Sequence, residues 1–205
     1  MNNNLNDFVS FANHLSDESA KIIKQYFRKS FDVENKKDES PVTIVDKNTE
    51  LKIRDLISNK YPNHGILGEE FESKDTNSEY LWVIDPIDGT RSFIAGSKDF
   101  GTLIALLHNK KPILGIINCP IHEERWVGIR GQQTTMNGQK VNTSNKKTLD
   151  QSYLSSTGLY MFENDNFKKS FEKIINKTKS YRYGGDCYNY GMVASGYIDI
   201  VIENM

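Results

Sequence analysis

The sequence predicts an α+β fold, organised as a single domain with two packed lobes at approximately residues 1–130 and 131–205. Two observations favour this fold. Apolar residues near the N-terminus recur at helical spacing, whereas short apolar runs typical of strands follow one another closely in the middle of the chain. No repeat or low-complexity linker separates the lobes. A chain of 205 residues is also long enough to bury a substantial core.

Two helices are predicted in the first quarter of the chain. In residues 5–27, apolar side chains recur at three- and four-residue steps and give one apolar helix face. The second helix follows Asp46, a residue type common at helix N-caps, and runs to about Lys60. Residues 41–45, between the helices, are expected to form a short strand or turn.

The middle of the chain predicts an antiparallel sheet. Residues 81–84 form an apolar run typical of a buried strand, which is expected to end at Asp85. Residues 102–107 and 113–119 predict two further strands joined by a turn-forming Asn-Lys-Lys-Pro segment, and residues 125–129 predict another.

The last third of the chain alternates polar segments with short periodic ones. The expected elements, in order, are a turn at 137–138, a helix at 162–175, an extended segment at 180–183, a helix at 188–195 and a strand at 198–202.

Composition excludes several function classes. The formal net charge of -1 gives no overall attraction to nucleic acid or to an anionic membrane. The N-terminus is rich in asparagine and lacks the order of a secretory signal, and no apolar run approaches the roughly 20 residues that span a bilayer. We therefore expect a cytoplasmic protein without a nucleic-acid or membrane partner.

Other catalytic signatures are missing from the sequence. Cys119 and Cys187 lie far apart and in no metal-binding spacing, so they are expected to be buried free thiols. The sequence contains no GxxxxGK[ST] phosphate loop, no HExxH zinc pair and no GxSxG nucleophile motif.

The segment Asp-Pro-Ile-Asp-Gly-Thr, directly after the first predicted strand, carries the clearest chemical signal. Asp85 and Asp88 flank a turn restrained by proline, so both carboxylates can converge on a hard divalent cation, with the Ile87 carbonyl as a further oxygen ligand. Magnesium fits this set of ligands. The alternative is that the two aspartates only cap a turn or a helix.

The end of this segment suits an anion. Gly89 allows the backbone to approach a phosphate closely, and a helix that begins near Thr90 would direct its free N–H groups toward it.

The whole segment resembles the Asp-Pro-Ile-Asp-Gly-Thr motif of the inositol monophosphatase superfamily. Residues 91–94 (Arg-Ser-Phe-Ile) and 100–103 (Phe-Gly-Thr-Leu) are similar to the histidinol-phosphatase-like branch of that superfamily. Two upstream features also match: Gly-Glu-Glu at residues 68–70, and Asp46 after a Pro-Val-Thr stretch.

The resemblance implies a layered αβαβα sandwich of the inositol monophosphatase type and covers nearly the whole chain. It also implies that the chain lacks the last strand and helix of that fold and is incomplete at its C-terminus. Among the features expected there is a Trp-Asp or Tyr-Asp pair whose aspartate completes a metal site.

The resemblance further implies a role for each matched residue. Glu69, Asp85 and the Ile87 carbonyl would surround one Mg²⁺, and Asp85 and Asp88 would hold a second. Asp46 and Thr90 would orient the attacking water. Substrate contacts are implied for Ile87, Asp88, Gly89 and Thr90.

The segment Tyr-Gly-Gly-Asp-Cys-Tyr at residues 183–188 resembles the family segment that meets the alcohol part of the substrate. A carboxylate at Asp186 could pair with the ammonium group of histidinol phosphate. Arg182 could hold the phosphate, and Glu203 could line the same pocket. A helix N-cap for Asp186 and a solvated strand end for Arg182 are the alternatives.

These features together predict a Mg²⁺-dependent phosphomonoesterase, with histidinol phosphate as the favoured substrate. Inositol monophosphate and 3′-phosphoadenosine 5′-phosphate are alternative substrates. A catalytically silent remnant or an interaction module is the alternative from another class. The resemblance also implies a homodimer.

Overall fold

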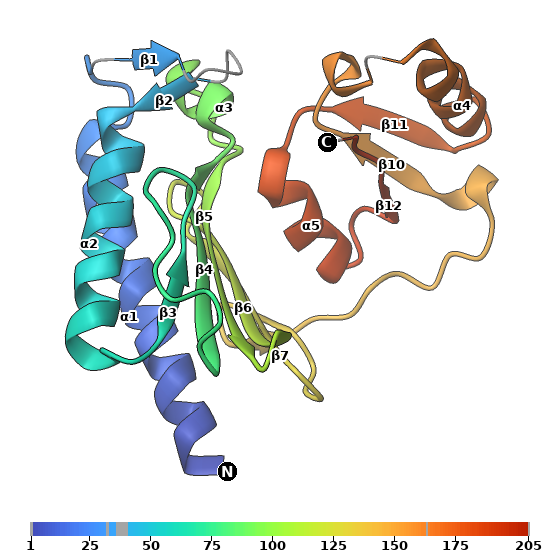
Figure 1. Ribbon diagram of the computed structural model, residues 1–205. Coiled ribbons are helices and arrows are strands. Elements are labelled where there is room, and N and C mark those ends of the chain that lie inside the picture. The colour runs from blue at the N-terminus through green and yellow to red at the C-terminus, as the bar shows by residue number, and fades with distance from the viewer. Residues whose placement is uncertain (1, 32, 36–40, 163, 205) are drawn as a thin grey trace.

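The computed structural model describes residues 2–31, 33–35, 41–162 and 164–204. Figure 1 shows their elements stacked in layers in the order helix, sheet, helix, sheet, helix. Helices α1 (Asn2–Tyr26) and α2 (Ile44–Lys60) form the first layer, and α5 (Asp186–Ala194) lies between the two sheets. Helix α4 (Asp165–Ile175) forms the last layer. This arrangement confirms the predicted α+β fold.

The large sheet has seven strands in the order β3-β4-β5-β6-β7-β8-β9. The strands are β3 (Gly65–Leu67), β4 (Tyr80–Asp88), β5 (Gly101–His108), β6 (Lys111–Cys119), β7 (Glu124–Ile129), β8 (Thr135–Met136) and β9 (Gln139–Lys140). Strand β3 runs parallel to β4, and all other neighbours are antiparallel, as the sequence predicts. The sheet thus extends to Lys140.

Two hairpins in this sheet follow from their turn residues. Asn109 and Lys110 join β5 to β6 with φ of 49° and 63°, and Asn137 and Gly138 join β8 to β9 with φ of 47° and 79°. Consecutive positive φ values give turns whose twist matches that of the strands, and asparagine and glycine adopt them readily. Both predicted turns are confirmed.

The first strand of the site is longer than predicted. Strand β4 does not end at Asp85 but continues to Asp88, which pairs with Gly101, and its register shifts between Asp85 and Asp88. Pro86 has no N–H to donate, which accounts for an interrupted ladder at this point. The irregularity separates the two aspartates while keeping both on one strand.

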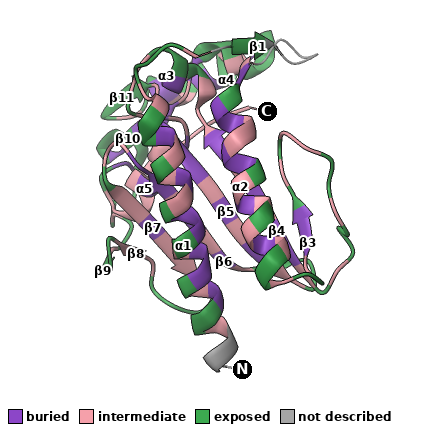
Figure 2. Ribbon diagram, turned by 90° about the vertical axis from the view of Figure 1, so that its left-hand side faces the viewer, coloured by how far each residue is buried: buried purple, intermediate pink, exposed green. Residues whose placement is uncertain are grey.

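The first layer is attached to the sheet through an apolar core. Phe8, Phe11 and Leu15 of α1 and Ile53 and Ile57 of α2 are buried against the strands. Figure 2 shows the buried residues of both helices as stripes that alternate with exposed ones. The predicted amphipathic helix is therefore confirmed, and it packs on the sheet.

The small sheet has the order β11-β10-β12, and both pairs of strands are parallel. Its strands are β10 (Tyr153–Ser156), β11 (Ser180–Tyr183) and β12 (Ile200–Val201). Strands β11 and β12 lie within predicted segments, but the central strand β10 was not predicted. Ser155 and Ser156 of this strand are buried but polar, so it has no apolar strand pattern.

The remaining elements are short. Strands β1 (Val33–Asn35) and β2 (Pro41–Thr43) form an antiparallel pair, α3 (Thr90–Ile94) follows β4, and 3₁₀ turns cover Leu149–Gln151 and Leu159–Met161. Among the described residues, no helix is both long and apolar enough to cross a membrane.

Candidate functional site

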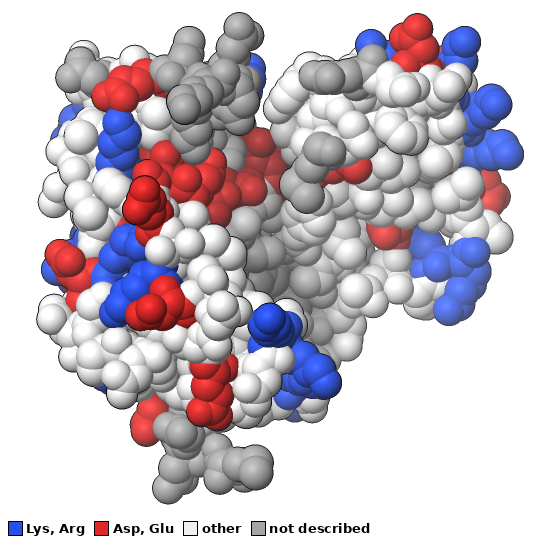
Figure 3. All heavy atoms as spheres, in the orientation of Figure 1, with Lys and Arg blue, Asp and Glu red and all other residues white. Residues whose placement is uncertain are grey.

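The predicted site residues gather where the two halves of the molecule face each other. A cavity of about 170 Å³ there is lined by Pro41, Glu69, Gly89, Thr90, Arg91, Tyr160 and Asp186. Figure 3 shows Asp and Glu side chains concentrated along the hollow between the halves. The larger half contributes the ends of β4 and α3, and the smaller half contributes the start of α5.

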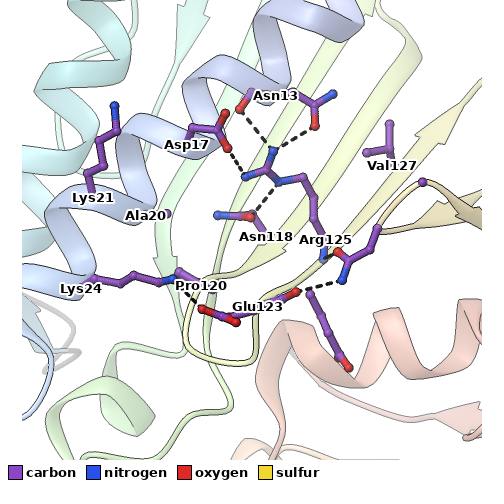
Figure 4. A pocket seen from close by; sticks show the side chains of 13 residues that line it. Asn13, Asp17, Ala20, Lys21, Lys24, Asn118, Pro120, Glu123, Arg125 and Val127 are labelled. Atoms are coloured by element: carbon purple, nitrogen blue, oxygen red, sulfur yellow. Dashed lines mark hydrogen bonds and ion pairs between the residues drawn. The ribbon is translucent and has the colours of Figure 1, made fainter.

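A larger cavity of about 520 Å³ lies on the opposite side of the sheet, between α1 and the β6–β7 hairpin (Figure 4). Its most prominent cation, Arg125, is already bonded to its neighbours. The guanidinium donates to Asp17 Oδ1 at 2.6 Å, to Asn118 Oδ1 at 2.8 Å and to Asn13 Oδ1 at 3.0 Å. These contacts attach α1 to the hairpin, so Arg125 has a structural role in this cavity.

Asp85 and Glu69 form the first pair of acids in the site. Their carboxyl groups are close enough to hydrogen-bond, although Glu69 comes from the turn after β3 and Asp85 from β4. Burial, followed by the charges of Glu69 and Asp88, raises the pKa of Asp85 well above its usual value. Within the described residues, the solvent-shielded Oδ1 of Asp85 has no hydrogen-bond partner. Adjacent acids of this kind favour a bound cation.

Asp88 is directed toward the second half of the molecule. Its Oδ1 accepts a hydrogen bond from the backbone N–H of Cys187 at 2.8 Å, at the start of α5. The pKa of Asp88 is raised to about 6, mainly by burial; the Cys187 hydrogen bond opposes this rise, and the charges of Asp186 and Glu203 contribute to it. Asp88 therefore links the acids of the two halves.

Asp46 lies in the first turn of α2, where it is almost fully buried. The expectation that it is the N-cap was wrong, because Thr43 is the N-cap and Asp46 is the third helical residue of a capping box. Its Oδ2 accepts hydrogen bonds from the Thr43 backbone N–H at 2.8 Å and from the Thr43 hydroxyl at 2.5 Å. Burial is the main reason that the pKa of Asp46 is raised.

The other oxygen of Asp46 faces the predicted catalytic threonine. Thr90 Oγ1 lies 3.2 Å from Asp46 Oδ1 and 3.0 Å from the carbonyl oxygen of Ile87. A hydroxyl has one hydrogen to donate, so it can bond only one of these acceptors fully and can accept a hydrogen bond from a third group. The structure thus brings together Asp46, Thr90 and Ile87.

Gly89 meets two structural requirements at once. Its φ of 90° lies in the left-handed region, and it precedes α3, which begins at Thr90 as predicted. A Cβ at this position would lie 2.9 Å from Cγ of Asp186. Glycine therefore allows the two halves to approach closely at the site.

Asp186 is the first residue of α5 and not its N-cap, which is Gly185. This corrects the capping alternative. Its φ of 42° is unusual for a residue other than glycine, and Ser92 Oγ donates a hydrogen bond to its Oδ2 at 2.7 Å. Burial raises the pKa of Asp186 against that hydrogen bond, and Glu203 adds to the rise. The carboxylate lines the cavity.

Neither Glu203 nor Arg182 is among the residues that line the cavity, which differs from the expectation for Glu203. Glu203 accepts hydrogen bonds from Thr157 Oγ1 at 2.5 Å and from the Tyr190 hydroxyl at 2.6 Å, and its charge affects both Asp88 and Asp186. Arg182 does not line the cavity; its Nη2 lies 3.5 Å from Oδ2 of Asp99. Its role in binding phosphate remains a prediction.

Three cavity-lining residues, Pro41, Arg91 and Tyr160, were not assigned to the site by sequence reasoning. The guanidinium of Arg91 lies 5.3 Å from the centroid of the Tyr160 ring, in cation–π range. Arg91 directly follows Thr90, so its position next to the motif could have indicated it. Tyr160 comes from the 3₁₀ turn at Leu159–Met161, and nothing in its sequence surroundings points to the site.

The donor chemistry fits a hard divalent cation such as Mg²⁺, because Glu69, Asp85, Asp88 and the Ile87 carbonyl offer only oxygen ligands. Within the part of the chain that the structure describes, no three acidic, histidine or cysteine side chains gather closely enough to hold a metal ion alone. Since Mg²⁺ usually keeps several waters and few protein carboxylates, the paired acids Glu69 and Asp85, with the unpartnered Asp85 Oδ1, remain compatible with it.

Comparison with known proteins gives a consistent picture. A sequence profile described as the inositol monophosphatase family matches residues 4–205. The bifunctional phosphatase IMPL2, chloroplastic, of Arabidopsis thaliana is 45% identical over 98% of this chain and 58% of that protein. A histidinol-phosphatase of Chlorobaculum parvum is 34% identical over 96% of this chain and 76% of that protein.

Comparison with solved structures identifies the same family as comparison of the sequences. An inositol monophosphatase from Zymomonas mobilis superimposes with a TM-score of 0.86 and 41% identity, covering 97% of this chain and 76% of that one. This chain therefore spans little more than half of the Arabidopsis protein and about three quarters of the other two.

Proposed function

Because this chain belongs to the inositol monophosphatase family, we propose that it is a Mg²⁺-dependent phosphomonoesterase that hydrolyses a small phosphorylated alcohol. The observation that carries the proposal is the contact between Glu69 and Asp85, with an unpartnered oxygen of Asp85 beside it. Two adjacent acids, of which Glu69 lines the cavity, create a local negative charge suited to a cation that binds phosphate.

The residues that would hold the metal all lie on the larger half. Glu69, Asp85 and the Ile87 carbonyl would bind one Mg²⁺, and Asp85 with Asp88 would bind a second. When bound, Mg²⁺ would supply positive charge that polarises the phosphate and makes a bound water more acidic.

The attacking water would be oriented by Asp46 and Thr90. Both hydrogen bonds from Thr43 go to Oδ2 of Asp46, whereas Oδ1 lies 3.2 Å from Thr90 Oγ1 and, as a carboxylate oxygen, can also accept a proton from a water. Thr90 Oγ1, which donates to Asp46 or to Ile87, can accept a hydrogen bond from the same water. The pair can thus fix a water at two points, as general-base chemistry requires.

The alcohol part of the substrate would meet residues of the smaller half. Asp186 and Tyr160 line the cavity on that side, and Glu203 adds negative charge nearby. The carboxylate of Asp186, with the charge of Glu203 nearby, favours an alcohol that carries a positive charge. Histidinol phosphate has an ammonium group, so it is the substrate that we favour over inositol monophosphate and 3′-phosphoadenosine 5′-phosphate.

Inositol monophosphate is the second candidate. The 41% identity to the Zymomonas mobilis enzyme, which is described as an inositol monophosphatase, favours it.

The test is phosphate release by the purified chain with Mg²⁺ or EDTA, on histidinol phosphate, inositol-1-phosphate and 3′-phosphoadenosine 5′-phosphate. We expect Mg²⁺-dependent turnover that is fastest on histidinol phosphate, and we expect Asp88→Asn to abolish it. Circular dichroism establishes that both chains are folded. A folded wild-type chain without turnover on any of the three would favour a noncatalytic interaction module instead.

A further inference from the structure

Glu50 is a buried acid outside the predicted chemistry. It lies in the middle of α2, and its side chain has no solvent exposure. A buried carboxylate costs several kcal/mol unless it is paired and hydrogen-bonded. The hydrogen-bond partners of Glu50 therefore indicate its role in the structure.

Both oxygens of Glu50 are used, and two of their three partners belong to the turn that carries Glu69. Oε2 accepts hydrogen bonds from the backbone N–H groups of Glu69 at 3.0 Å and Glu70 at 2.7 Å. Oε1 accepts a hydrogen bond from Arg54 Nε at 2.6 Å, one helical turn further along α2.

Arg54 completes the attachment from the other end of the turn. Its Nη2 donates to the carbonyl oxygen of Phe71 at 3.0 Å, and its guanidinium lies 5.9 Å from the centroid of the Phe71 ring. The carboxylate thus binds the amides that begin the turn, and the guanidinium binds the carbonyl that ends it.

Gly68 makes this contact possible. A Cβ at residue 68 would lie 2.0 Å from Glu50 Oε1 and 2.4 Å from its Cδ, well inside any real contact distance. The side chain of Glu50 therefore occupies the space that a larger residue at position 68 would need. The glycine of the Gly-Glu-Glu segment and the glutamate on α2 are complementary in shape and in hydrogen bonding.

We propose that Glu50, held in place by Arg54, is a positioning residue for the cation site. It fixes the backbone of Glu69, so that the Glu69 carboxylate faces Asp85 before a cation arrives. The inference rests on the proposed function, because it assigns Glu69 to the metal. Groups that orient a metal ligand typically change metal affinity by about 10- to 100-fold when they are removed.

The direct test is Glu50→Gln, which keeps one neutral oxygen for the two amides but presents an N–H donor to Arg54 in place of the second carboxylate oxygen. We expect the variant to bind Mn²⁺, used as a paramagnetic probe and measured by electron paramagnetic resonance, about 10- to 100-fold more weakly than wild type. We also expect amide hydrogen exchange at residues 69 and 70 to become faster. Asp55→Asn is the matched control, since it removes an exposed acid from the same helix, and it should change neither.

A second variant covers the case in which Glu50→Gln fails to fold. Gly68→Ala retains Glu50, Arg54 and their charges but displaces the turn from the Glu50 carboxylate. Because the backbone of Gly68 is not in the left-handed region, alanine adds no backbone strain there. We expect the same direction of change in Mn²⁺ affinity and in amide exchange.

The outcomes separate this inference from the proposed function. A wild-type chain that binds Mn²⁺, together with a folded variant that binds it equally well, would overturn the role of Glu50 alone. A wild-type chain that binds neither Mn²⁺ nor Mg²⁺ would overturn the proposed function and this inference together.

Discussion

The two halves of the molecule differ in what they bury and in what they bring to the site. The larger half, built on the seven-stranded sheet, has a continuous apolar core that includes Phe8, Phe11 and Trp82. The smaller half has a modest apolar core around Phe162 and Phe171. We expect the larger half to be the more rigid support, because dense apolar packing resists local opening.

The residues proposed for metal and water binding and the residue proposed for alcohol binding also lie on different halves. Asp46, Glu69, Asp85 and Asp88, the acids proposed for metal and water, all stand on the larger half. Asp186, which is proposed to contact the alcohol, begins α5 in the smaller half. A reaction centre on one half and a recognition surface on the other would allow substrate preference to change without disturbing the chemistry.

The halves nevertheless meet closely. Trp126 Nε1 on β7 donates to Ser195 Oγ at 2.8 Å, just after α5, and a Cβ at Gly191 would lie 2.7 Å from the Trp126 ring. Cys119 and Cys187 are buried free thiols, as predicted, and they belong to this same contact. The division is therefore one of chemical role within a packed structure.

The largest effect is expected from Asp46→Asn, which tests whether the larger half carries the reaction step. Asparagine can still accept the Thr43 hydrogen bonds of the capping box, so the helix should remain stable. Turnover should fall by about 10²- to 10⁴-fold, the usual range for loss of a general base. The Michaelis constant and Mn²⁺ affinity should change little, because the residue is assigned to neither substrate nor metal. Steady-state kinetics with Asp55→Asn as control measure this, and unchanged turnover would remove Asp46 from the mechanism.

The next effect is expected from Asp186→Asn, which tests whether the smaller half sets substrate preference. Asparagine adopts the positive φ of this position at least as readily as aspartate and can keep the Ser92 hydrogen bond. A hydrogen bond to a charged group contributes about 1.5–3 kcal/mol. The Michaelis constant for histidinol phosphate should therefore rise by about 10- to 100-fold.

Inositol-1-phosphate is the internal control for that variant, since it has no cationic group. Its kinetic constants should stay close to those of the wild-type chain. An equal loss on both substrates would mean that Asp186 supports the fold of the site and does not select the alcohol.

Sequence patterns predicted the larger half better than the smaller one. Helical spacing located α1, and turn residues such as Asn137 and Gly138 located the hairpins, because these signals are local. Strand β10 gave no such signal, since Ser155 and Ser156 are buried through contacts with distant segments, including the hydrogen bond from Ser155 to Asn189.

The candidate site shows the same limit. The motif at residues 85–90 and its resemblance to a known family indicated the acids on β4, but sequence could not show the pairing of Arg182 with Asp99. It also could not distinguish Glu50 from a solvated helix acid, because its partners at residues 69 and 70 lie 19 and 20 positions away. The environments of Glu50 and Arg182 depend on hydrogen bonds to residues distant in sequence, which local sequence patterns do not reveal.

The smallest effect concerns the stability of the larger half at low pH. His64 is stacked between Tyr61 and Tyr80, with ring centroids 4.6 and 4.9 Å away, and its Nδ1 accepts a hydrogen bond from Trp82 Nε1 at 3.1 Å. Burial lowers the pKa of His64, against a smaller opposite effect of Glu79. The unfolded chain therefore binds this proton more readily than the folded one.

The stability that neutral His64 provides should be complete above the pKa of an unfolded histidine, about 6.5, and should be lost as pH falls through the lower pKa of the folded state. Protonation removes the acceptor of the Trp82 hydrogen bond, which is worth about 1 kcal/mol. His64→Gln, which offers an acceptor that does not titrate, should lose less unfolding free energy than wild type between pH 7 and pH 5. Urea unfolding at several pH values measures the difference, and the exposed His14→Gln should leave it unchanged. If the unfolding free energies of wild type and His64→Gln changed in parallel with pH, protonation of His64 would not affect its contacts with Tyr61, Tyr80 and Trp82. The stability of the larger half would then not depend on the charge state of His64.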